Sequence, residues 1–437
     1  MSDSSQRLGS AASAFRSRNF RFYQSARLLG ILGAEAQTIA VAWQVYQITH
    51  RAIDLGYTGL ALFLPGIFFA LFAGHVADRY DRRNIIRICY ILQAVCTAAL
   101  LWIALSGTRN VLFIYTILFL IGTGRAFSGP ASSALVPQLV PRDDFFNAVT
   151  WGATFFQIAN VAGPALGGIL FTLPLSGPLA FLHGAPIVYC FTIAGLTSFV
   201  ILISMVKPQG APARRENVSL KTVLAGLHYL WYKKLLLGSI SLDLFAVLLG
   251  GAVSLMPIFA EEILHAGPAG LGMLRAAPSV GALTVSLLLT IKPIRHNAGK
   301  KMLTCVGIYG LATILFGLSK SLWLSLAALA IVGASDMVSV VVRSSLLQMA
   351  TPPEMRGRVS AVNWLFLGAS NEFGEFESGL TAQWLGAVRA VVVGGVLSVT
   401  VTALWSILFK PLRNVDQLTT ESLLSANEMQ AVAEPVE

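Results

Sequence analysis

Residues 74–83 read GHVADRYDRR, a polar and basic turn between two apolar runs. The run before this turn covers about residues 55–77, and the run after it covers about residues 88–107. Each run is about twenty residues long, which is the length that an α-helix needs to cross the hydrocarbon core of a bilayer. The stretch therefore predicts a tight connection between two membrane-spanning helices at the membrane surface.

Apolar runs of this length recur along the whole chain of 437 residues. Hydrophobic residues make up 55% of the chain and charged residues only 12%, and the mean hydropathy is +0.70. A soluble protein carries about twice that charged fraction. We therefore predict an all-α membrane protein with twelve spans, at about 24–48, 55–77, 88–107, 110–130, 148–172, 185–206, 236–260, 269–291, 302–319, 322–343, 360–385 and 390–409.

The basic residues are distributed unequally between the two sides that alternate along such a chain. If the N-terminus is cytoplasmic, the N-terminal segment, the cytoplasmic loops and the C-terminal tail hold 23 of the 31 Lys and Arg residues, and the opposite loops hold 4. This asymmetry is the positive-inside pattern of membrane proteins. The net charge of +10 is thus explained by orientation in a lipid bilayer, and we predict no nucleic-acid partner.

The sequence contains no motif of an enzyme, a cofactor site or a metal site. HExxH, GxSxG and P-loop patterns are absent. The four cysteines all fall in apolar runs, and their spacing is not that of metal ligands. We therefore predict a protein that is not an enzyme and that has no cofactor and no metal.

A polar linker divides the chain into two halves of six spans each. The linker, at 207–235, contains Pro, Gly and six Lys or Arg residues, and its part from Val218 to Trp231 is amphipathic, as in a helix at the membrane surface. The predicted organisation is a cytoplasmic segment at 1–19, a six-helix bundle at 20–206, the linker at 207–235, a second six-helix bundle at 236–409 and a cytoplasmic tail at 410–437.

The two halves resemble each other in sequence. The stretch SSAL at 132–135, followed by Pro141, corresponds to SSLL at 344–347, followed by Pro353, at an offset of 212 residues. The same offset places the fourth span over the tenth and the fifth over the eleventh. Two parallel six-helix repeats with a site between them near the midplane are a known transporter plan. We therefore predict two pseudo-symmetric six-helix bundles.

The turn at residues 74–83 has the ordered form G-x-x-x-D-R-x-x-R-R. A simple anchor at the cytoplasmic surface needs only positive charge, whereas the ordered pattern resembles the signature between the second and third helices of the major facilitator superfamily. The resemblance implies a conformational latch, in which an Asp–Arg network holds the two halves together in one state. Close helix approach is also expected at the glycine. The latch residues are Gly74, Asp78, Arg79, Arg82 and Arg83.

A second motif lies in the fifth span. Residues 160–168 read NVAGPALGG, and the pattern G-P-x-x-G-G is similar to the antiporter motif of the same superfamily. Pro164 can bend the helix, while Gly163, Gly167 and Gly168 allow tight packing and sliding; helix packing alone is the alternative. Three further runs, 241–264, 267–283 and 351–379, are similar to the subgroup that includes enterobactin-type siderophore exporters.

Charged residues inside the predicted spans are candidate functional residues, because intramembrane charges mark substrate or ion paths or pair with one another. Arg125 and Asp336 occupy nearly equivalent positions in the two repeats, within GTGR and GASD. Either they line a central cavity, where Arg125 binds an anionic group, or they form a structural ion pair. Arg125 also resembles the arginine in the fourth helix of proton antiporters.

Two further spans carry such residues. Asp243 in the seventh span lies about 10 Å into its helix, where it can line a cavity or make a structural contact near the cytoplasmic end. Glu35 in the first span lies deeper, with Gln37 and Gln44 nearby. These three residues suit a polar cavity wall with Glu35 as a proton carrier, and a hydrogen-bonded helix contact is the alternative.

The eleventh predicted span contains the stretch GASNEFGEFESG, with three glutamates. Glu372 and Glu375 are three residues apart and share a helix face, whereas Glu377 points about 140° away from Glu372. Two carboxylates in a low-dielectric site favour holding a proton, so Glu372 and Glu375 are candidate proton carriers. The alternative is a structural network with Arg275 or Arg343.

The resemblance and the charges together predict a secondary transporter in the inner membrane of a bacterium, with both termini cytoplasmic. It would export a small amphiphilic molecule, siderophore-like or drug-like, by proton antiport with alternating access, and act as a monomer. Two alternatives stay open: uptake by proton symport, and a membrane receptor or scaffold that does not transport. The candidate residues are Glu35, Asp336, Glu372 and Glu375 for proton coupling, and Arg125, Asn371, Gln37 and Asp243 for the substrate cavity.

Overall fold

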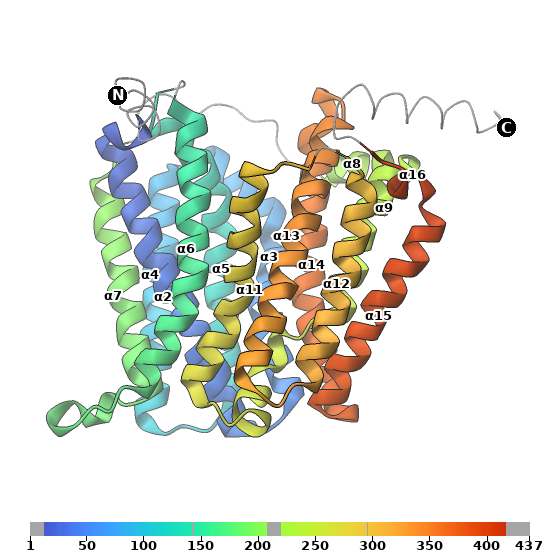
Figure 1. Ribbon diagram of the computed structural model, residues 1–437. Coiled ribbons are helices and arrows are strands. Elements are labelled where there is room, and N and C mark those ends of the chain that lie inside the picture. The colour runs from blue at the N-terminus through green and yellow to red at the C-terminus, as the bar shows by residue number, and fades with distance from the viewer. Residues whose placement is uncertain (1–12, 142–143, 208–219, 295, 417–437) are drawn as a thin grey trace, which may run out of the picture. The chain divides into compact units, whose positions relative to one another are not determined.

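The computed structural model describes residues 13–141, 144–207, 220–294 and 296–416 (Figure 1). A short 3-10 turn, η1 (Ser13–Arg16), precedes the first half of the chain. The long helices of this half are α2 (Arg18–Thr49), α3 (Ala52–Arg79), α4 (Arg82–Ser106), α5 (Val111–Leu135), α6 (Phe145–Thr172) and α7 (Ala185–Met205).

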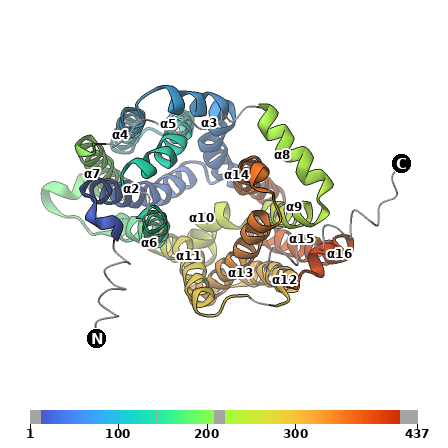
Figure 2. The same cartoon turned by 90° about the horizontal axis from the view of Figure 1, so that it is seen from above.

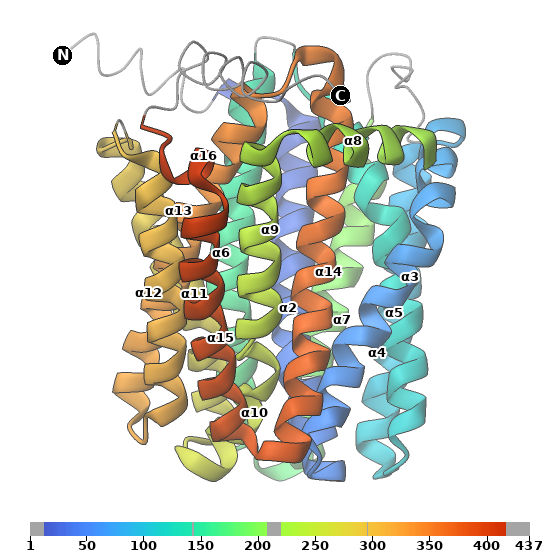
Figure 3. The same ribbon diagram turned by 90° about the vertical axis from the view of Figure 1, so that its right-hand side faces the viewer.

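The second half begins with α8 (Leu220–Tyr232), a helix of 13 residues in the linker, within which residues 208–219 lie outside the described ranges. Figure 3 shows α8 lying across the ends of the long helices α9 and α14. The remaining helices are α9 (Lys234–Gly250), α10 (Met256–Ile258), α11 (Gly267–Ile291), α12 (Ala298–Leu318), α13 (Leu322–Met349), α14 (Pro353–Leu385), α15 (Ala387–Leu408) and α16 (Lys410–Arg413).

Eleven of the described helical segments are long and apolar enough to cross a membrane. The twelfth predicted span is α14, which is 33 residues long and differs from the others by its three glutamates. Several helices are longer than the apolar runs that predicted them, because a helix can continue beyond the hydrocarbon core into the polar interface. The prediction of an all-α membrane fold with twelve spans is confirmed by this architecture.

Local sequence explains where the helices begin and end. The side chain of Asp81 caps the start of α4 by accepting a hydrogen bond from the backbone N–H of Arg83, at 3.0 Å. Gly107 ends α4 in a left-handed conformation, with φ of 67°, which a residue without Cβ adopts at little cost. Three residues later, Asn110 caps α5 in the same way by accepting from Leu112 N.

The chain forms two compact units, which we call unit 1 and unit 2. Unit 1 consists of Met1–His50, Leu60–Asn217 and Ala266–Ala276, and unit 2 of Arg51–Gly59, Val218–His265 and Ala277–Glu437. The first turns of α3 therefore belong to unit 2, and the first turns of α11 belong to unit 1. The boundaries of the two units follow from how the helices pack, so they differ from the boundaries obtained by dividing the chain at the linker.

The two units use the same helix pairings. In unit 1, α2 packs on α6 and α7, and α4 packs on α5 and α7 (Figure 2). In unit 2, α9 packs on α14 and α15, and α12 packs on α13 and α15. In each half, the first long helix therefore packs on the fifth and the sixth, and the third packs on the fourth and the sixth. The repeat that the sequence predicts is thus present in the packing.

The seventh predicted span is present at Lys234–Ile263, but it is not one continuous α-helix. Helix α9 ends at Gly250, and the chain continues through a 3-10 turn, the short α10 and a π-helical turn, η6 (Phe259–Ile263). The hydroxyl of Ser378 on α14 donates to the carbonyl of Gly251, and the hydroxyl of Tyr309 on α12 donates to that of Gly250, at 3.4 Å. Carbonyls freed by a break inside a membrane need such partners.

Candidate functional site

The motif in the fifth span packs against the first span, within unit 1. A Cβ at Gly167 of α6 would lie 2.7 Å from the carbonyl oxygen of Ala36 on α2, and one at Gly163 would clash with the Cβ of Glu35. The backbones of α2 and α6 therefore approach closely only because these positions are glycine. Glu35, the candidate proton carrier, lies directly against the first glycine of the motif.

The last glycine of this motif faces another helix. A Cβ at Gly168 would lie 2.7 Å from the carbonyl oxygen of Pro268, in the part of α11 that belongs to unit 1. In return, a Cβ at Gly272 of α11 would lie 2.6 Å from the carbonyl oxygen of Pro164. The motif G-P-x-x-G-G is thus a packing element with two sides, one against α2 and one against α11.

The two glutamines near Glu35 make contacts between helices of unit 1. Gln37 is 6% exposed, and its side-chain oxygen accepts a hydrogen bond of 2.8 Å from the hydroxyl of Thr97 on α4. Gln44 accepts a hydrogen bond of 2.7 Å from the hydroxyl of Tyr189 on α7. This is the hydrogen-bonded helix contact that the sequence left open as the alternative to a cavity wall.

Arg125 lies on α5 and is exposed on unit 1. It acts electrostatically on Tyr90 of α4, and so does Arg27 of α2. Arg27 donates to the carbonyl of Gly152 at 3.4 Å. The sequence did not single out Arg27, although its place inside an apolar helix was a signal for it.

The latch motif ties the turn after α3 to other helix ends of unit 1. Arg82 is 6% exposed and donates to the carbonyl of Ala134 at the end of α5, at 2.9 Å. Arg83 donates to the carbonyl of Val206 after α7, at 3.0 Å. Cationic groups at helix C-termini satisfy the free carbonyls there and complement the helix dipole.

The other latch residues contribute less to these contacts. Arg79 is exposed, and the side chain of Asp78 lies outside the described part of the structure. No described atom lies within 4 Å of a Cβ placed at Gly74, so the close helix approach that we expected there is not found among the described residues.

An ion pair is buried inside unit 2. The guanidinium of Arg343 on α13 pairs with the carboxylate of Asp243 on α9, and their side chains are 2% and 5% exposed. Asp336 and Tyr309 lie close enough to interact electrostatically with this pair. The sequence identified Asp243 and Asp336 but not the partner of either. For Asp243, the geometry is that of the structural contact.

The glutamates of α14 lie against the start of α3, also within unit 2. A Cβ at Gly59 would lie 2.9 Å from Oε2 of Glu375 and 3.1 Å from Oε2 of Glu372. The two carboxylates therefore converge on one point of α3, as expected from their shared face. Glu377 differs, since its Oε1 accepts a hydrogen bond of 2.6 Å from the hydroxyl of Thr381 on the same helix. Asn371, on the same stretch of α14, is exposed.

The backbones of α3 and α14 also approach closely beside these carboxylates. A Cβ at Gly379 would lie 3.0 Å from the carbonyl oxygen of Ala52, and one at Gly56 would lie 3.0 Å from Cα of Phe376. Sequence analysis missed Gly56 and Gly59. The spacing of small residues at i and i+3 in the second span was the available signal.

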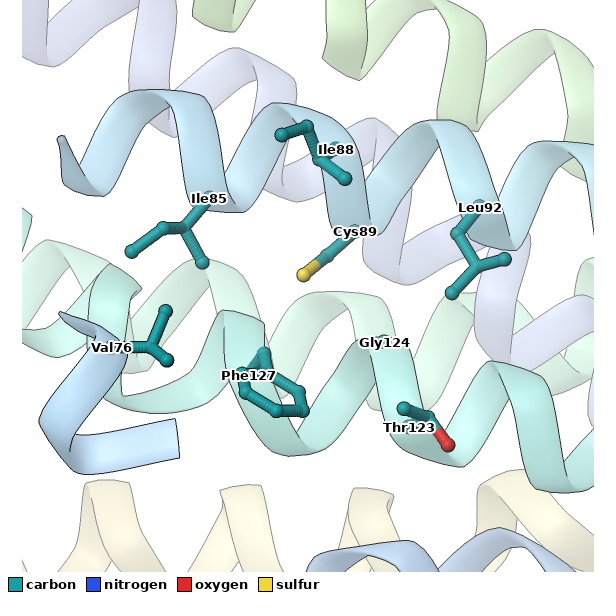
Figure 4. A pocket seen from close by; sticks show the side chains of 8 residues that line it. All are labelled: Val76, Ile85, Ile88, Cys89, Leu92, Thr123, Gly124 and Phe127. Carbon is teal, nitrogen blue, oxygen red and sulfur yellow. The ribbon is translucent and has the colours of Figure 1, made fainter. Parts of the chain in front are cut away.

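A cavity in unit 1 has no charged residue among those that line it. It has a volume of about 260 Å³ between α3, α4 and α5, and its walls are almost wholly apolar. Figure 4 shows Cys89 and Leu92 of α4 pointing toward Phe127 and Thr123 of α5. A cavity of this kind suits apolar groups and cannot by itself stabilise a charged one.

The fold and the paired units define a multi-pass membrane transporter of the major facilitator type. The family model described as transmembrane secretion effector matches residues 9–437. The chain therefore belongs to this family of the major facilitator superfamily, whose members are transporters and not enzymes.

Relatives with names are similar over most of the chain. The protein "Enterobactin exporter EntS" of Citrobacter koseri is 27% identical over 388 residues, which cover 87% of this chain and 88% of the relative. The protein of the same name from Escherichia coli is 28% identical over 381 residues, covering 85% and 86%.

Solved structures share the fold. The nucleoside transporter NupG superposes with a TM-score of 0.62 at 14% identity, covering 90% of this chain and 99% of that one. A bacterial homologue of the iron transporter ferroportin in the inward-facing state gives a TM-score of 0.66 at 14% identity, covering 91% and 99%. At such identities the likeness concerns the fold alone.

Proposed function

We propose that the protein exports a small amphiphilic molecule, siderophore-like or drug-like, by alternating access coupled to proton antiport. The observation that carries the coupling is the convergence of Glu372 and Glu375 on Gly59 inside a membrane helix. Two carboxylates at one place in a low-dielectric site repel each other when both are charged, so the site favours holding a proton. Export is supported by the family and by the relatives named enterobactin exporter.

Alternating access requires helices that move against one another. The glycine crossings of α6 with α11 and of α3 with α14 bring backbones close together, and at the second crossing the ring centroids of Tyr57 and Phe376 also lie 5.6 Å apart. Contacts made through glycine permit sliding, because fewer side chains must move when the helices shift. Protonation at Glu372 and Glu375 would change the charge at one of these crossings, which links proton binding to movement. We place the protein in the bacterial inner membrane, with both termini cytoplasmic.

Proton flux in everted membrane vesicles tests the proposal. A panel of siderophores and antibiotics is added to vesicles that hold the wild type, Glu35→Gln, Glu372→Gln or Glu375→Gln. We expect a substrate to evoke proton movement in the wild type, and one of the three substitutions to abolish it at unchanged protein level. Glu377→Gln is the matched control, because Glu377 lies on the same helix but bonds to Thr381 instead of facing Gly59.

Three other outcomes would argue against this function. Accumulation of the compound on the cytoplasmic side, driven by the proton gradient, would replace export with uptake by symport. Binding of a compound without flux would indicate a receptor or scaffold. Flux that survives all three substitutions would contradict proton coupling through these carboxylates.

A further inference from the structure

A cluster of exposed basic residues lies at the end of unit 2 where α12 begins and α15 ends. The cluster consists of Lys300 and Lys301 in the first turn of α12 and of Lys410 and Arg413, the first and last residues of α16. A Cβ at Gly299 would clash with the carbonyl oxygen of Leu412 and would lie 3.4 Å from the carbonyl carbon of Arg413. The two segments that carry the basic residues are therefore in backbone contact.

The chain after α16 fixes this contact by capping α12. The carbonyl oxygens of Asp416 and Val415 accept hydrogen bonds of 3.0 Å from the backbone N–H groups of Ala298 and Gly299, respectively. The side chains of Leu412 and Val415 are only 0% and 7% exposed, so they anchor the segment in the apolar core of unit 2. The first N–H groups of α12 thus have partners from the chain itself.

The corresponding end of unit 1 uses its basic residues differently. Helices α4 and α12 are both the third long helix of their half. Arg82 and Arg83 at the start of α4 donate to the carbonyls of Ala134 and Val206, at the ends of other helices. The basic residues of unit 1 therefore close the fold at this place.

The basic cluster of unit 2 makes no such bonds. Lys301, Lys410 and Arg413 form no hydrogen bond or ion pair with another described residue, and Lys300 interacts electrostatically with Asp416. Asp416 is the one acidic residue in the described segments 296–301 and 410–416, and its carboxylate accepts from Asn297 N and from the ring of His296. Four basic residues against one carboxylate leave a surplus of positive charge that faces the surroundings.

An exposed apolar surface adjoins the basic cluster. Leu404, Ile407 and Leu408 in the last turns of α15 are 46%, 64% and 60% exposed, and α16 begins one residue after α15 ends. Figure 3 shows α16 at the end of α15, next to α9. A basic surface beside apolar side chains at the end of a membrane helix matches a phospholipid with an anionic headgroup.

We propose that Lys300, Lys301, Lys410 and Arg413 bind the headgroup of an anionic phospholipid, whose acyl chains lie along the end of α15. Lysine and arginine form charge-assisted hydrogen bonds with phosphate oxygens. Orientation in the bilayer requires only positive charge on one side, whereas here the backbone contact of two distant segments gathers four cations on one surface. The bound lipid would hold α16 against α12, whatever molecule the protein transports.

Hydrogen exchange at Ala298 and Gly299 tests the inference, because their N–H groups bond to the segment after α16. The full-length protein is placed in nanodiscs of dioleoyl phosphatidylcholine, with or without dioleoyl phosphatidylglycerol, which differ in headgroup charge and have the same acyl chains. Protection of the two amides should be about tenfold greater with phosphatidylglycerol, as for a ligand present at about ten times its dissociation constant. Added salt should reduce this difference.

Variants locate the effect. Lys301→Gln/Arg413→Gln should lose the dependence on phosphatidylglycerol and keep the protection that the wild type has in phosphatidylcholine. Lys301→Arg/Lys410→Arg should retain the dependence, because the charges remain. Lys320→Gln/Arg389→Gln is the matched control and should behave as the wild type, since these exposed residues of unit 2 lie at the other ends of α12 and α15.

Three outcomes would overturn the inference. The first is equal protection in the two lipids, or a lipid dependence that survives Lys301→Gln/Arg413→Gln. The second is the same gain in protection when glycerol 3-phosphate is added to phosphatidylcholine nanodiscs, which would assign the site to a soluble phosphate. The third is protection that ignores the lipid and falls when the glutamates of the tail at 417–437, which lies outside the described residues, are replaced by glutamine. That result would show that the tail itself covers the basic cluster.

Discussion

Arg343 of unit 2 is 2% exposed and paired with Asp243, whereas Arg27 and Arg125 of unit 1 have no carboxylate partner in the described part of that unit. All three arginines lie in long apolar helices of the same fold, but Arg343 is buried, Arg27 is half-buried and Arg125 is exposed. The arginines therefore differ in exposure as well as in whether the protein itself supplies the counter-charge. An internal pair fixes two helices to each other, while an uncompensated cation remains available to a ligand.

The difference between the paired and the unpaired arginines allows a structural role to be distinguished from a functional role by mutation. Loss of a paired charge should lower the stability of unit 2, because its partner is left buried and alone. Loss of an uncompensated charge should lower ligand binding and transport and leave stability nearly unchanged.

Removal of Asp243 should have the largest effect. Asp243→Leu removes the ion-pair partner of the buried guanidinium of Arg343 and leaves it only the electrostatic interaction with Asp336, which costs about 3–5 kcal/mol of the free energy of unfolding. Denaturant or thermal unfolding of the purified protein in detergent measures this loss.

The double variant Asp243→Leu/Arg343→Leu is the control for this prediction. Two apolar residues of similar volume can replace a buried pair at little cost, so the double variant should recover most of the loss. A single variant as stable as the double variant would show that Arg343 finds another anion, and the contrast between the units would then fail.

Leucine at either glycine crossing should cost less, and about equally in the two units. Gly272→Leu in unit 1 and Gly379→Leu in unit 2 each force a side chain against a neighbouring backbone carbonyl, at an expected cost of about 1–3 kcal/mol in unfolding free energy and with loss of export. Gly66→Leu on α3 is the control, because no described atom lies within 4 Å of a Cβ there. Equal costs would show that the units differ in charge and not in packing.

Arg125→Gln should change stability by no more than about 0.5 kcal/mol, the range of ordinary exposed positions. Export of an anionic substrate should nevertheless fall to the vesicle background, because the substrate loses its counter-charge. Parallel measurements of unfolding midpoint and flux check both halves of this expectation. A stability loss as large as that of Asp243→Leu would mean that Arg125 has a structural partner after all.

Much of the architecture could be predicted from the sequence. The length of apolar runs is set by the bilayer, so twelve spans and their approximate positions follow from composition alone. The repeat offset placed Arg125 and Asp336 at related positions of the two halves. The helical period placed Glu372 and Glu375 on one face, and in the structure both carboxylates lie against Gly59.

The partners across helices could not be predicted. Asp243 and Arg343 are 100 residues apart in sequence, and helical periodicity gives the face of a residue but not the helix that it meets. The break of α9 after Gly250 was also missed, because the apolar run continues through it. Its signals were the adjacent Gly250 and Gly251, yet glycine pairs are common in membrane helices, so only the hydroxyls of Tyr309 and Ser378 identify the break.

The smallest expected effect concerns an exposed ion pair outside the membrane. The carboxylate of Asp416 accepts hydrogen bonds from the backbone N–H of Asn297, at 2.7 Å, and from the ring of His296, at 3.2 Å, while the carbonyl of Asp416 accepts from Ala298 N. The hydrogen bond from Asn297 and that from His296 lower the pKa of Asp416 below its ordinary value of 3.8. The stabilisation from the carboxylate is therefore complete above pH 3.8 and is lost as the pH falls through the folded-state pKa.

Hydrogen exchange at Asn297 should report this loss. Its protection should decrease in the wild type when the pH is lowered below 3.8, whereas Asp416→Asn should show weaker protection at about pH 7 and no such decrease. Salt adds a second distinction, because an exposed pair is screened and a buried pair is not. High salt should weaken the Asp416 contact in the wild type and leave the stability contributed by Asp243 and Arg343 unchanged. If salt weakened both equally, the Arg343 pair would have to be open to solvent, and its contrast with Arg27 and Arg125 would be one of degree only.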